Sequence, residues 1–227
     1  MSSAEATVLR STVLRPLDLS VYLVTDTRLC GAFGVAATVA AAIGAGATTV
    51  QLRDPDATDA ELVTLGRSLV TLLTGTAIPL LVNDRVHLVE PIGAQGAHIG
   101  QSDLPVIEAR QLLGPHALLG LSAQTLDHVM DARSTPPRTI DYLGVGPVWH
   151  QTTKPNAAPP CGLDGFAAIA EMSPWPCVAI GGIDTERIPS LRSAGAAGVA
   201  VVSAICGQPD VARATGLVSA AWHSSEH

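Results

Sequence analysis

Short apolar segments recur along this chain, and most of its chemically reactive polar residues lie just past the C-terminal end of one of them. The midpoints of successive segments are roughly 18 to 36 residues apart, which is the length of one strand plus one crossover helix. Strands that deliver functional groups at one end only are typical of a closed parallel barrel. The predicted strands are Val21–Val24, Thr49–Leu52, Ile78–Val82, Ala97–Ile99, Leu118–Leu121, Tyr142–Val145, Val178–Ile180 and Val199–Val202.

Helical patterns lie between several of these strands. Asp59–Leu73 places its leucines on one face, and Leu104–Leu113 follows Asp103, a candidate N-cap. The other predicted helices are Ala36–Ala45, Asp184–Ala194 and Val211–Trp222. An open doubly wound sheet is the rival, but Thr25–Gly31 lacks the G-x-G-x-x-G form of its first turn. We therefore predict an α/β protein, a single (β/α)8 TIM barrel.

The composition limits the domain organisation and the partners. A chain of 227 residues with 47% hydrophobic and 15% charged residues can bury one large core. We predict an N-terminal tail or short helix over 1–17 and one barrel domain over 18–227. A net charge of −7 without a basic patch argues against nucleic acid as a partner. The apolar stretch Val35–Ala47 is too short to span a bilayer, so we expect no membrane partner and a cytoplasmic location.

Small residues follow the last two predicted strands. Gly181 and Gly182 come after the seventh, and Val202 and Ser203 end or follow the eighth. In barrels these two loops, together with a helix N-terminus, present backbone N–H groups to a phosphate. A tight turn made by the two glycines is the simpler alternative.

Two carboxylates follow the third and fourth strands, which are neighbours in a barrel. Asp84 and Asp103 can therefore converge on one hard cation, and Mg²⁺ is commonly held by one or two carboxylates plus substrate phosphates. The alternatives are a helix N-cap for Asp103, and a turn residue or a partner of Arg85 for Asp84. The pattern predicts Mg²⁺ as the cofactor.

Two cationic residues complete a candidate anion site. Lys154 is the only lysine among thirteen lysines and arginines, which indicates a need for a compact ammonium in its loop. A solvated loop lysine is the alternative. Arg53, after the second strand, can contact a phosphate through two N–H groups, or it can simply pair with Asp54 or Asp56. With the phosphate loops, these residues imply two phosphorylated moieties, one of them a leaving pyrophosphate.

Eight short motifs follow one another along the chain. They are Gln51-Leu52-Arg53-Asp54, Asn83-Asp84-Arg85, His98-Ile99-Gly100-Gln101-Ser102-Asp103, Gly120-Leu121-Ser122, Asp141 to Pro147, Thr152-Thr153-Lys154-Pro155, Ile180-Gly181-Gly182-Ile183 and Val201-Val202-Ser203-Ala204. Any one motif is weak, whereas the ordered set is highly specific. From about Tyr22 to Ile205, this set resembles the thiamine phosphate synthase family.

The resemblance implies condensation of hydroxymethylpyrimidine diphosphate with a thiazole phosphate, releasing pyrophosphate by a dissociative mechanism. By position, the pyrimidine diphosphate would contact Gln51, Arg53, Asn83, Ser122 and Lys154. Of these, Arg53, Ser122 and Lys154 would be catalytic. The thiazole phosphate would contact Thr153, Gly182, Val202 and Ser203. Asp84 and Asp103 would ligate Mg²⁺. The sequence does not decide between a monomer and a homo-oligomer.

Three positions depart from the family pattern. Pro55 replaces a lysine, Gln124 a common histidine and Gln151 a threonine. Arg28 or Arg85 could supply the cation lost at Pro55. Two rival functions follow. A thiazole phosphate isomerase would need a histidine base instead of paired carboxylates and a lysine, and a non-catalytic sensor of phosphorylated ligands would explain the departures.

Overall fold

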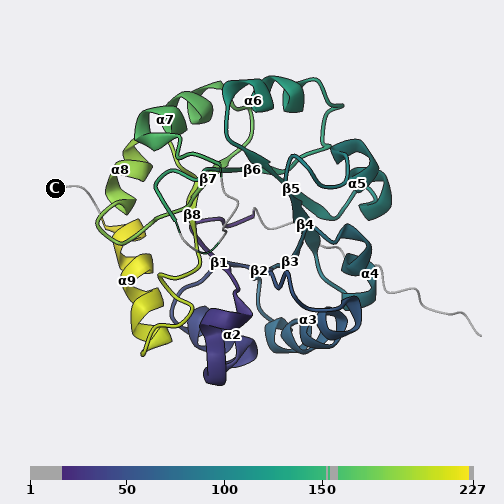
Figure 1. Ribbon diagram of the computed structural model, residues 1–227, viewed down its shortest axis with the longest axis vertical. Coiled ribbons are helices and arrows are strands. Elements are labelled where there is room, and N and C mark those ends of the chain that lie inside the picture. The colour runs from purple at the N-terminus through teal and green to yellow at the C-terminus, as the bar shows by residue number, and fades with distance from the viewer. Residues whose placement is uncertain (1–16, 152, 154–157, 225–227) are drawn as a thin grey trace, which may run out of the picture.

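The computed structural model describes residues 17–151, 153 and 158–224. Eight parallel strands close into a barrel in sequence order, with β1 pairing with both β2 and β8. Figure 1 looks down this barrel, with the strands as an inner ring and the helices around them. The predicted (β/α)8 barrel is confirmed.

The strands are short, and each ends close to where the apolar pattern ends. They are β1 Val21–Val24, β2 Thr49–Leu52, β3 Leu80–Asn83, β4 Gly96–Ile99, β5 Leu118–Ala123, β6 Tyr142–Val145, β7 Cys177–Ile180 and β8 Gly198–Val201. The α-helices are α1 Thr27–Cys30, α2 Val35–Gly44, α3 Asp59–Leu73, α4 Val89–Ile92, α5 Val106–Leu113, α6 Leu126–Arg133, α7 Gly162–Met172, α8 Ile188–Ser193 and α9 Val211–His223. Two 3₁₀ turns, Gly31–Phe33 and Val86–Leu88, precede α2 and α4.

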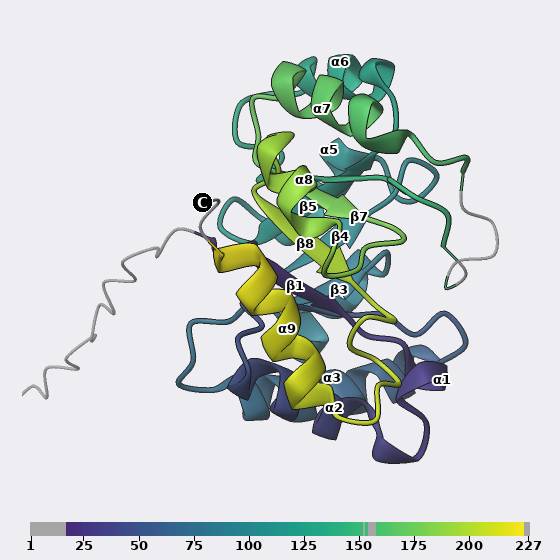
Figure 2. The same cartoon turned by 90° about the vertical axis from the view of Figure 1, so that its left-hand side faces the viewer.

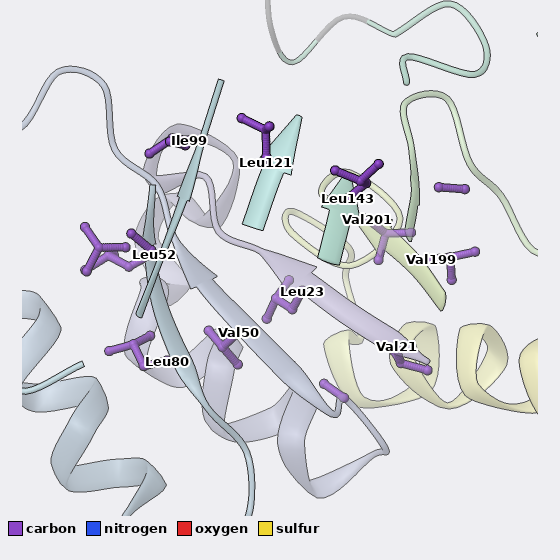
Figure 3. Close-up of a cluster of buried hydrophobic side chains, with 14 of the residues drawn as sticks. Val21, Leu23, Val50, Leu52, Leu80, Ile99, Leu121, Leu143, Val199 and Val201 are labelled. Atoms are coloured by element: carbon purple, nitrogen blue, oxygen red, sulfur yellow. The ribbon is translucent and has the colours of Figure 1, made fainter. Parts of the chain in front are cut away.

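The core has two layers because the strands are buried on both faces. Outward-facing residues such as Leu23, Val50 and Leu143 pack under the helices, and Figure 3 shows these side chains along the strands. Inside the barrel, a smaller cluster contains Tyr22, Leu81 and others. Figure 2 shows the barrel from the side, with α9 lying over β1 and β8. Burial on both faces explains why these strands lack apolar-polar alternation.

Helix starts differ most from the sequence predictions. The prediction that Asp103 caps a helix at Leu104 is wrong, because its carboxylate accepts the Gly100 N–H at 2.7 Å and α5 begins at Val106 after Pro105. The predicted helix Asp184–Ala194 is shorter, because the Asp184 carboxylate binds the N–H groups of Glu186 and Arg187 in a turn.

The predicted N-terminal tail, Met1–Leu17, lies outside the described residues except for Leu17. Among the described helices, none alone has the length and hydropathy to cross a membrane, although the bent pair Thr27–Phe33 and Val35–Gly44, at 87° to each other, meets the criteria jointly by length and composition.

Candidate active site

Most of the predicted site residues come together at the carboxyl ends of the strands. Those on β2 to β5 form what we call the side-chain cluster: Gln51, Arg53, Asn83, Asp84, Asp103 and Ser122. An open cleft is lined by Arg53, Asn83 and Asp84 of this cluster, together with Asp54, Pro55, Leu62 and Arg85. The strand order therefore brings residues that are distant in sequence together at the carboxyl-terminal rim of the barrel.

Arg53 is fixed by the first βα loop. Its backbone N–H donates to the Thr25 hydroxyl at 3.0 Å, and its guanidinium lies 3.7 Å from the Asp26 carboxylate. The side chains of Arg53 and Asp26 are only 17% and 13% exposed. The alternative pairing with Asp54 or Asp56 is wrong, because Asp56 pairs with Arg28 and Asp54 caps its own loop. A half-buried arginine beside the cleft suits an anionic ligand.

Asp84 occupies a strained backbone conformation. Its φ of 59° is left-handed, which costs a residue with a side chain on the order of 1–3 kcal/mol. The turn is held by the Asp84 N–H donating to the His98 carbonyl at 2.9 Å, which ties the end of β3 to β4. This turn exposes Asp84 while Asn83 ends β3 half-buried. Strain at this position is consistent with a functional carboxylate.

The two aspartates fit a Mg²⁺ ion better than a softer metal. They follow neighbouring strands and offer hard oxygen donors, the ligands that Mg²⁺ prefers. Asp103 uses Oδ2 for the Gly100 N–H, and its Oδ1 accepts no hydrogen bond from another described residue. Within the described ranges no group of three histidines, cysteines or acids could hold a metal. A two-carboxylate site of this kind leaves coordination positions for phosphate oxygens and water.

Ser122 and Gln51 are connected inside the barrel by hydrogen bonds through three other side chains, which the sequence did not assign to the site. The Ser122 hydroxyl lies 3.0 Å from His98 Nε2, and Gln51 Nε2 donates to the Tyr22 hydroxyl at 2.8 Å. Tyr142 lies between His98 and Tyr22. His98 is thus a hydrogen-bonded histidine of the barrel interior. One signal pointed to the tyrosines: they are the only two in the chain, and each lies in a predicted strand.

The ends of β7 and β8 differ because they offer backbone groups. Gly182, Val202 and Ser203 form what we call the backbone cluster. The N–H groups of Gly182 and Ser203 donate to no other described residue. Val202 begins a helical turn, since its carbonyl accepts the N–H groups of Ile205 and Cys206. Free N–H groups at the start of a helical turn are suited to bind a phosphate.

The glycines of this cluster are also required by packing. Gly182 has a φ of 66°, and a Cβ there would lie 2.5 Å from the His150 carbonyl oxygen. Gly181 is similar, with a φ of 97° and a Cβ position 2.6 Å from Pro147. The two glycines therefore do form a tight turn. The same turn leaves the Gly182 N–H group without an acceptor among the described residues.

The loop after β6 lies against the backbone cluster. The Trp149 N–H donates to the Gly181 carbonyl at 3.0 Å, and the Arg187 guanidinium lies 4.9 Å from the Trp149 ring centroid. The Thr153 hydroxyl donates to the Gln151 side-chain oxygen at 2.9 Å. Gln151, which departs from the family pattern, therefore contacts Thr153, a residue predicted to bind the thiazole phosphate. Lys154 lies outside the described residues.

The two candidate replacements for the lost lysine differ in position. Arg85 lines the same cleft as Pro55, and its guanidinium donates to the Ala57 carbonyl at 2.7 Å and to Asp59 at 3.0 Å. Arg28 instead forms an exposed ion pair with Asp56 at 2.7 Å. Arg85 is therefore the better-placed cation.

A closed parallel barrel with polar and charged side chains at the carboxyl ends of its strands has the architecture of the (β/α)8 barrel enzymes. The chain belongs to the thiamine monophosphate synthase family, whose model matches residues 21–205.

Individual relatives agree with this family. A thiamine-phosphate synthase of Azorhizobium caulinodans is 44% identical over 199 residues, covering 88% of this chain and 92% of the relative. One of Xanthobacter autotrophicus is 44% identical over 207 residues, covering 91% and 97%. The solved structure of a thiamine phosphate pyrophosphorylase from Pyrococcus furiosus superposes with a TM-score of 0.81 at 30% identity, covering 91% of this chain and 96% of that one. The resemblance in the sequence motifs is thereby confirmed.

Proposed function

We propose that this enzyme joins hydroxymethylpyrimidine diphosphate to a thiazole phosphate, giving thiamine phosphate and pyrophosphate. The observation that carries the proposal is the construction of the barrel mouth, with charged and polar side chains at the ends of β2 to β5 and backbone N–H groups at the ends of β7 and β8. A pyrophosphate leaving group gains negative charge in the transition state, which cationic side chains and a metal ion can stabilise. A phosphate that only anchors its substrate can be held by backbone N–H donors.

In this proposal the side-chain cluster binds the pyrimidine diphosphate. Arg53 meets the diphosphate, with Arg85 behind it, and Asn83 offers an amide at the same rim. Gln51 and Ser122, deeper in the barrel, contact the pyrimidine ring. As the bond between the methylene carbon and the diphosphate oxygen breaks, both electrons leave with pyrophosphate. Arg53 then stabilises the growing negative charge, as would Lys154 from its loop.

Asp84 and Asp103 would hold Mg²⁺ in this enzyme. When bound, the ion would neutralise charge on the pyrophosphate oxygens. The remaining work falls to the protein: the barrel interior excludes water from the pyrimidine cation until the thiazole nitrogen supplies its electron pair to the methylene carbon. No proton transfer to a strong base is required, which fits the hydrogen-bonded state of His98.

The backbone cluster, with Thr153, would bind the thiazole phosphate. The N–H groups of Gly182 and Ser203 face a ligand that must be held but not cleaved. Fixed backbone donors suit this role because they need no reorganisation when the substrate arrives.

The thiazole phosphate isomerase is the main rival, since His98 lies in the site. An isomerase moves only protons, so it would not need the Asp84 and Asp103 carboxylates that follow two neighbouring strands. A non-catalytic sensor would not need Asp84 in a strained turn.

We also propose that residues 18–227 form a single domain and that the protein is located in the cytoplasm.

Release of pyrophosphate from the purified protein with both substrates and Mg²⁺ tests the proposal. We expect pyrophosphate to form only when both substrates and the metal are present, with one thiamine phosphate per pyrophosphate. Conversion of thiazole phosphate alone would favour the isomerase. Binding of either substrate without turnover under any metal condition would favour the sensor.

A further inference from the structure

A chain of hydrogen bonds runs through the inside of the barrel and joins two proposed substrate contacts. From Gln51 Nε2 it passes to the Tyr22 hydroxyl at 2.8 Å, and from there to the Tyr142 hydroxyl at 2.7 Å. It continues to His98 Nδ1 at 2.9 Å and ends with His98 Nε2 at 3.0 Å from the Ser122 hydroxyl. These five residues come from five different strands, and we call them the interior relay.

The orientation of the Gln51 amide fixes which group donates in each hydrogen bond of the relay. Gln51 donates to Tyr22, whose buried hydroxyl has no other described partner than Tyr142. Tyr22 must therefore donate its single hydrogen to Tyr142, because a buried hydroxyl hydrogen without an acceptor is unfavourable. Tyr142 then donates to His98 Nδ1, so the ring carries its hydrogen on Nε2. His98 consequently donates to Ser122.

Both ends of the relay are left with a defined role. Ser122 accepts from His98 and keeps its own hydrogen to donate into the site. Gln51 uses Nε2 for Tyr22, and its Oε1 accepts no hydrogen bond from another described residue. That oxygen is not sealed in the core, because no buried side-chain nitrogen or oxygen lacks a partner in the described part of the chain. The relay thus leaves one donor, on Ser122, and one acceptor, on Gln51, without a partner among the described residues.

Two glycines show that the barrel is built around this relay. A Cβ at Gly120 would lie 2.2 Å from Tyr142 Cζ and 2.4 Å from His98 Nδ1. A Cβ at Gly144 would lie 2.7 Å from His98 Cε1. Gly120 pairs with His98 on one side and with Tyr142 on the other in the strand register. Any side chain on these two inward positions would displace the rings.

The two tyrosines of the relay are neutral. Burial raises the pKa of Tyr22 and of Tyr142 above the usual tyrosine value, so both stay protonated at physiological pH. A neutral relay conserves its direction, because each member has one hydrogen to give and one acceptor to give it to.

We propose that Tyr22, Tyr142 and His98 are positioning residues that hold Ser122 as a hydrogen-bond donor and Gln51 as an acceptor toward the substrate. An aminopyrimidine edge carries an exocyclic amine beside a ring nitrogen, which is the complementary pair of one donor and one acceptor. The inference rests on the proposed function in taking the pyrimidine as the ligand at this end. It extends that function by naming the residues that make Ser122 a hydrogen-bond donor and Gln51 an acceptor.

The tautomer of His98 tests the relay directly in the wild-type protein. Nitrogen-15 NMR of labelled protein in mildly alkaline buffer distinguishes a ring protonated on Nε2 from one protonated on Nδ1, and a His98→Gln variant assigns the signal. We expect His98 to be neutral with its hydrogen on Nε2. A ring protonated on Nδ1 would overturn the direction of the relay.

A double-mutant cycle tests the consequence for substrate. Tyr142→Phe removes the donor to His98, and we expect kcat/KM for the pyrimidine diphosphate to fall about tenfold while KM for thiazole phosphate stays unchanged. In a Ser122→Ala background, Tyr142→Phe should have almost no further effect. An equal loss in both backgrounds, or an equal loss for both substrates, would mean that Tyr142 serves only the fold.

The two proposals fail in different ways. If the wild-type protein releases no pyrophosphate, the proposed function is wrong. If it does so and Tyr142→Phe matches it in kcat/KM with a native melting curve, the function stands and the relay has no positioning role.

Discussion

The two sides of the barrel mouth are built from different groups. The side-chain cluster on β2 to β5 uses an arginine, two carboxylates, amides and a hydroxyl, and one of its members, Asp84, has a left-handed backbone. The backbone cluster on β7 and β8 uses N–H groups of small residues, which are confined by the loop from β6. A leaving pyrophosphate gains negative charge in the transition state, and an arginine together with a metal ion held by carboxylates can neutralise it. A phosphate that is not cleaved keeps its charge, and backbone N–H donors can hold it. In the proposed function, this difference assigns chemistry to the side-chain cluster and anchoring to the backbone cluster.

The largest effect should come from the carboxylates. We expect Asp84→Ala to lower kcat/KM by about 10²–10³-fold, on the scale of losing one group that stabilises a transition state. Binding of thiazole phosphate, measured by calorimetry, should change little. Asp127→Ala, which removes an exposed carboxylate on α6, serves as the control. If Asp84→Ala weakened thiazole phosphate binding as much as turnover, the division into two clusters would be wrong.

Lys154 should follow, with an effect on kcat more than on KM. We expect about a hundredfold lower kcat in Lys154→Ala, because the charge that this lysine meets grows in the transition state. Lys154→Arg should recover only part of the loss, since a planar guanidinium places its charge differently. Steady-state kinetics on both variants measures this, and an unchanged kcat in Lys154→Ala would remove the lysine from the mechanism.

A smaller effect is expected on the backbone side, where stability and anchoring change together. Gly182→Ala puts a Cβ 2.5 Å from the His150 carbonyl oxygen at a φ of 66°. We expect a loss of about 1–3 kcal/mol in the free energy of unfolding and a KM for thiazole phosphate raised about tenfold.

Gly216→Ala is the matched control for this prediction. Gly216 lies within α9, and a Cβ there meets nothing within 4 Å. We expect this variant to be more stable by roughly 0.5–1 kcal/mol, since alanine is the better helix former. Thermal unfolding with a KM for each substrate compares the two. A Gly182→Ala protein that binds thiazole phosphate like the wild type would show that the N–H groups there hold no phosphate.

The smallest effect concerns the departure at Pro55. Pro55→Lys adds a cation to the cleft that Arg53 and Arg85 already line. We expect pyrimidine diphosphate to bind tighter by about 1 kcal/mol, on the scale of one net hydrogen bond, which is about fivefold in Kd. Thiazole phosphate binding should not change. Weaker diphosphate binding in this variant would indicate that Arg85 already fills the position.

The fold was predictable because each strand is an apolar run that ends at a polar residue. Two of the structural strands illustrate the limit: β3 starts and ends later than predicted, and β5 continues through Ser122, because inward-facing polar residues can belong to a strand. Helix α3 matches its prediction in full. Its Thr58 and Glu61 form a capping box that fixes its start. Helix α5 does not, because Asp103 binds a turn instead of a helix end.

The site was predictable only where a residue follows a strand. Arg53, Asp84 and Gly182 were identified in this way, together with their side of the barrel. Tyr22 and Tyr142 were not, because their contact joins residues 120 positions apart through the barrel interior. The pairing of Arg53 with Asp26 was missed because it depends on the parallel register of β1 with β2, which brings the loops after both strands together.

Diffraction from a crystal soaked with Mn²⁺, pyrophosphate and thiazole phosphate tests the central claim most directly, because the anomalous signal of Mn²⁺ locates the metal without bias. The account predicts one Mn²⁺ within coordination distance of the Asp84 and Asp103 carboxylates and bound to pyrophosphate. It also predicts a thiazole phosphate at the N–H groups of Gly182 and Ser203. Pyrophosphate at Gly182 and Ser203, or Mn²⁺ away from both aspartates, would contradict the assignment of chemistry and anchoring to opposite sides of the barrel mouth.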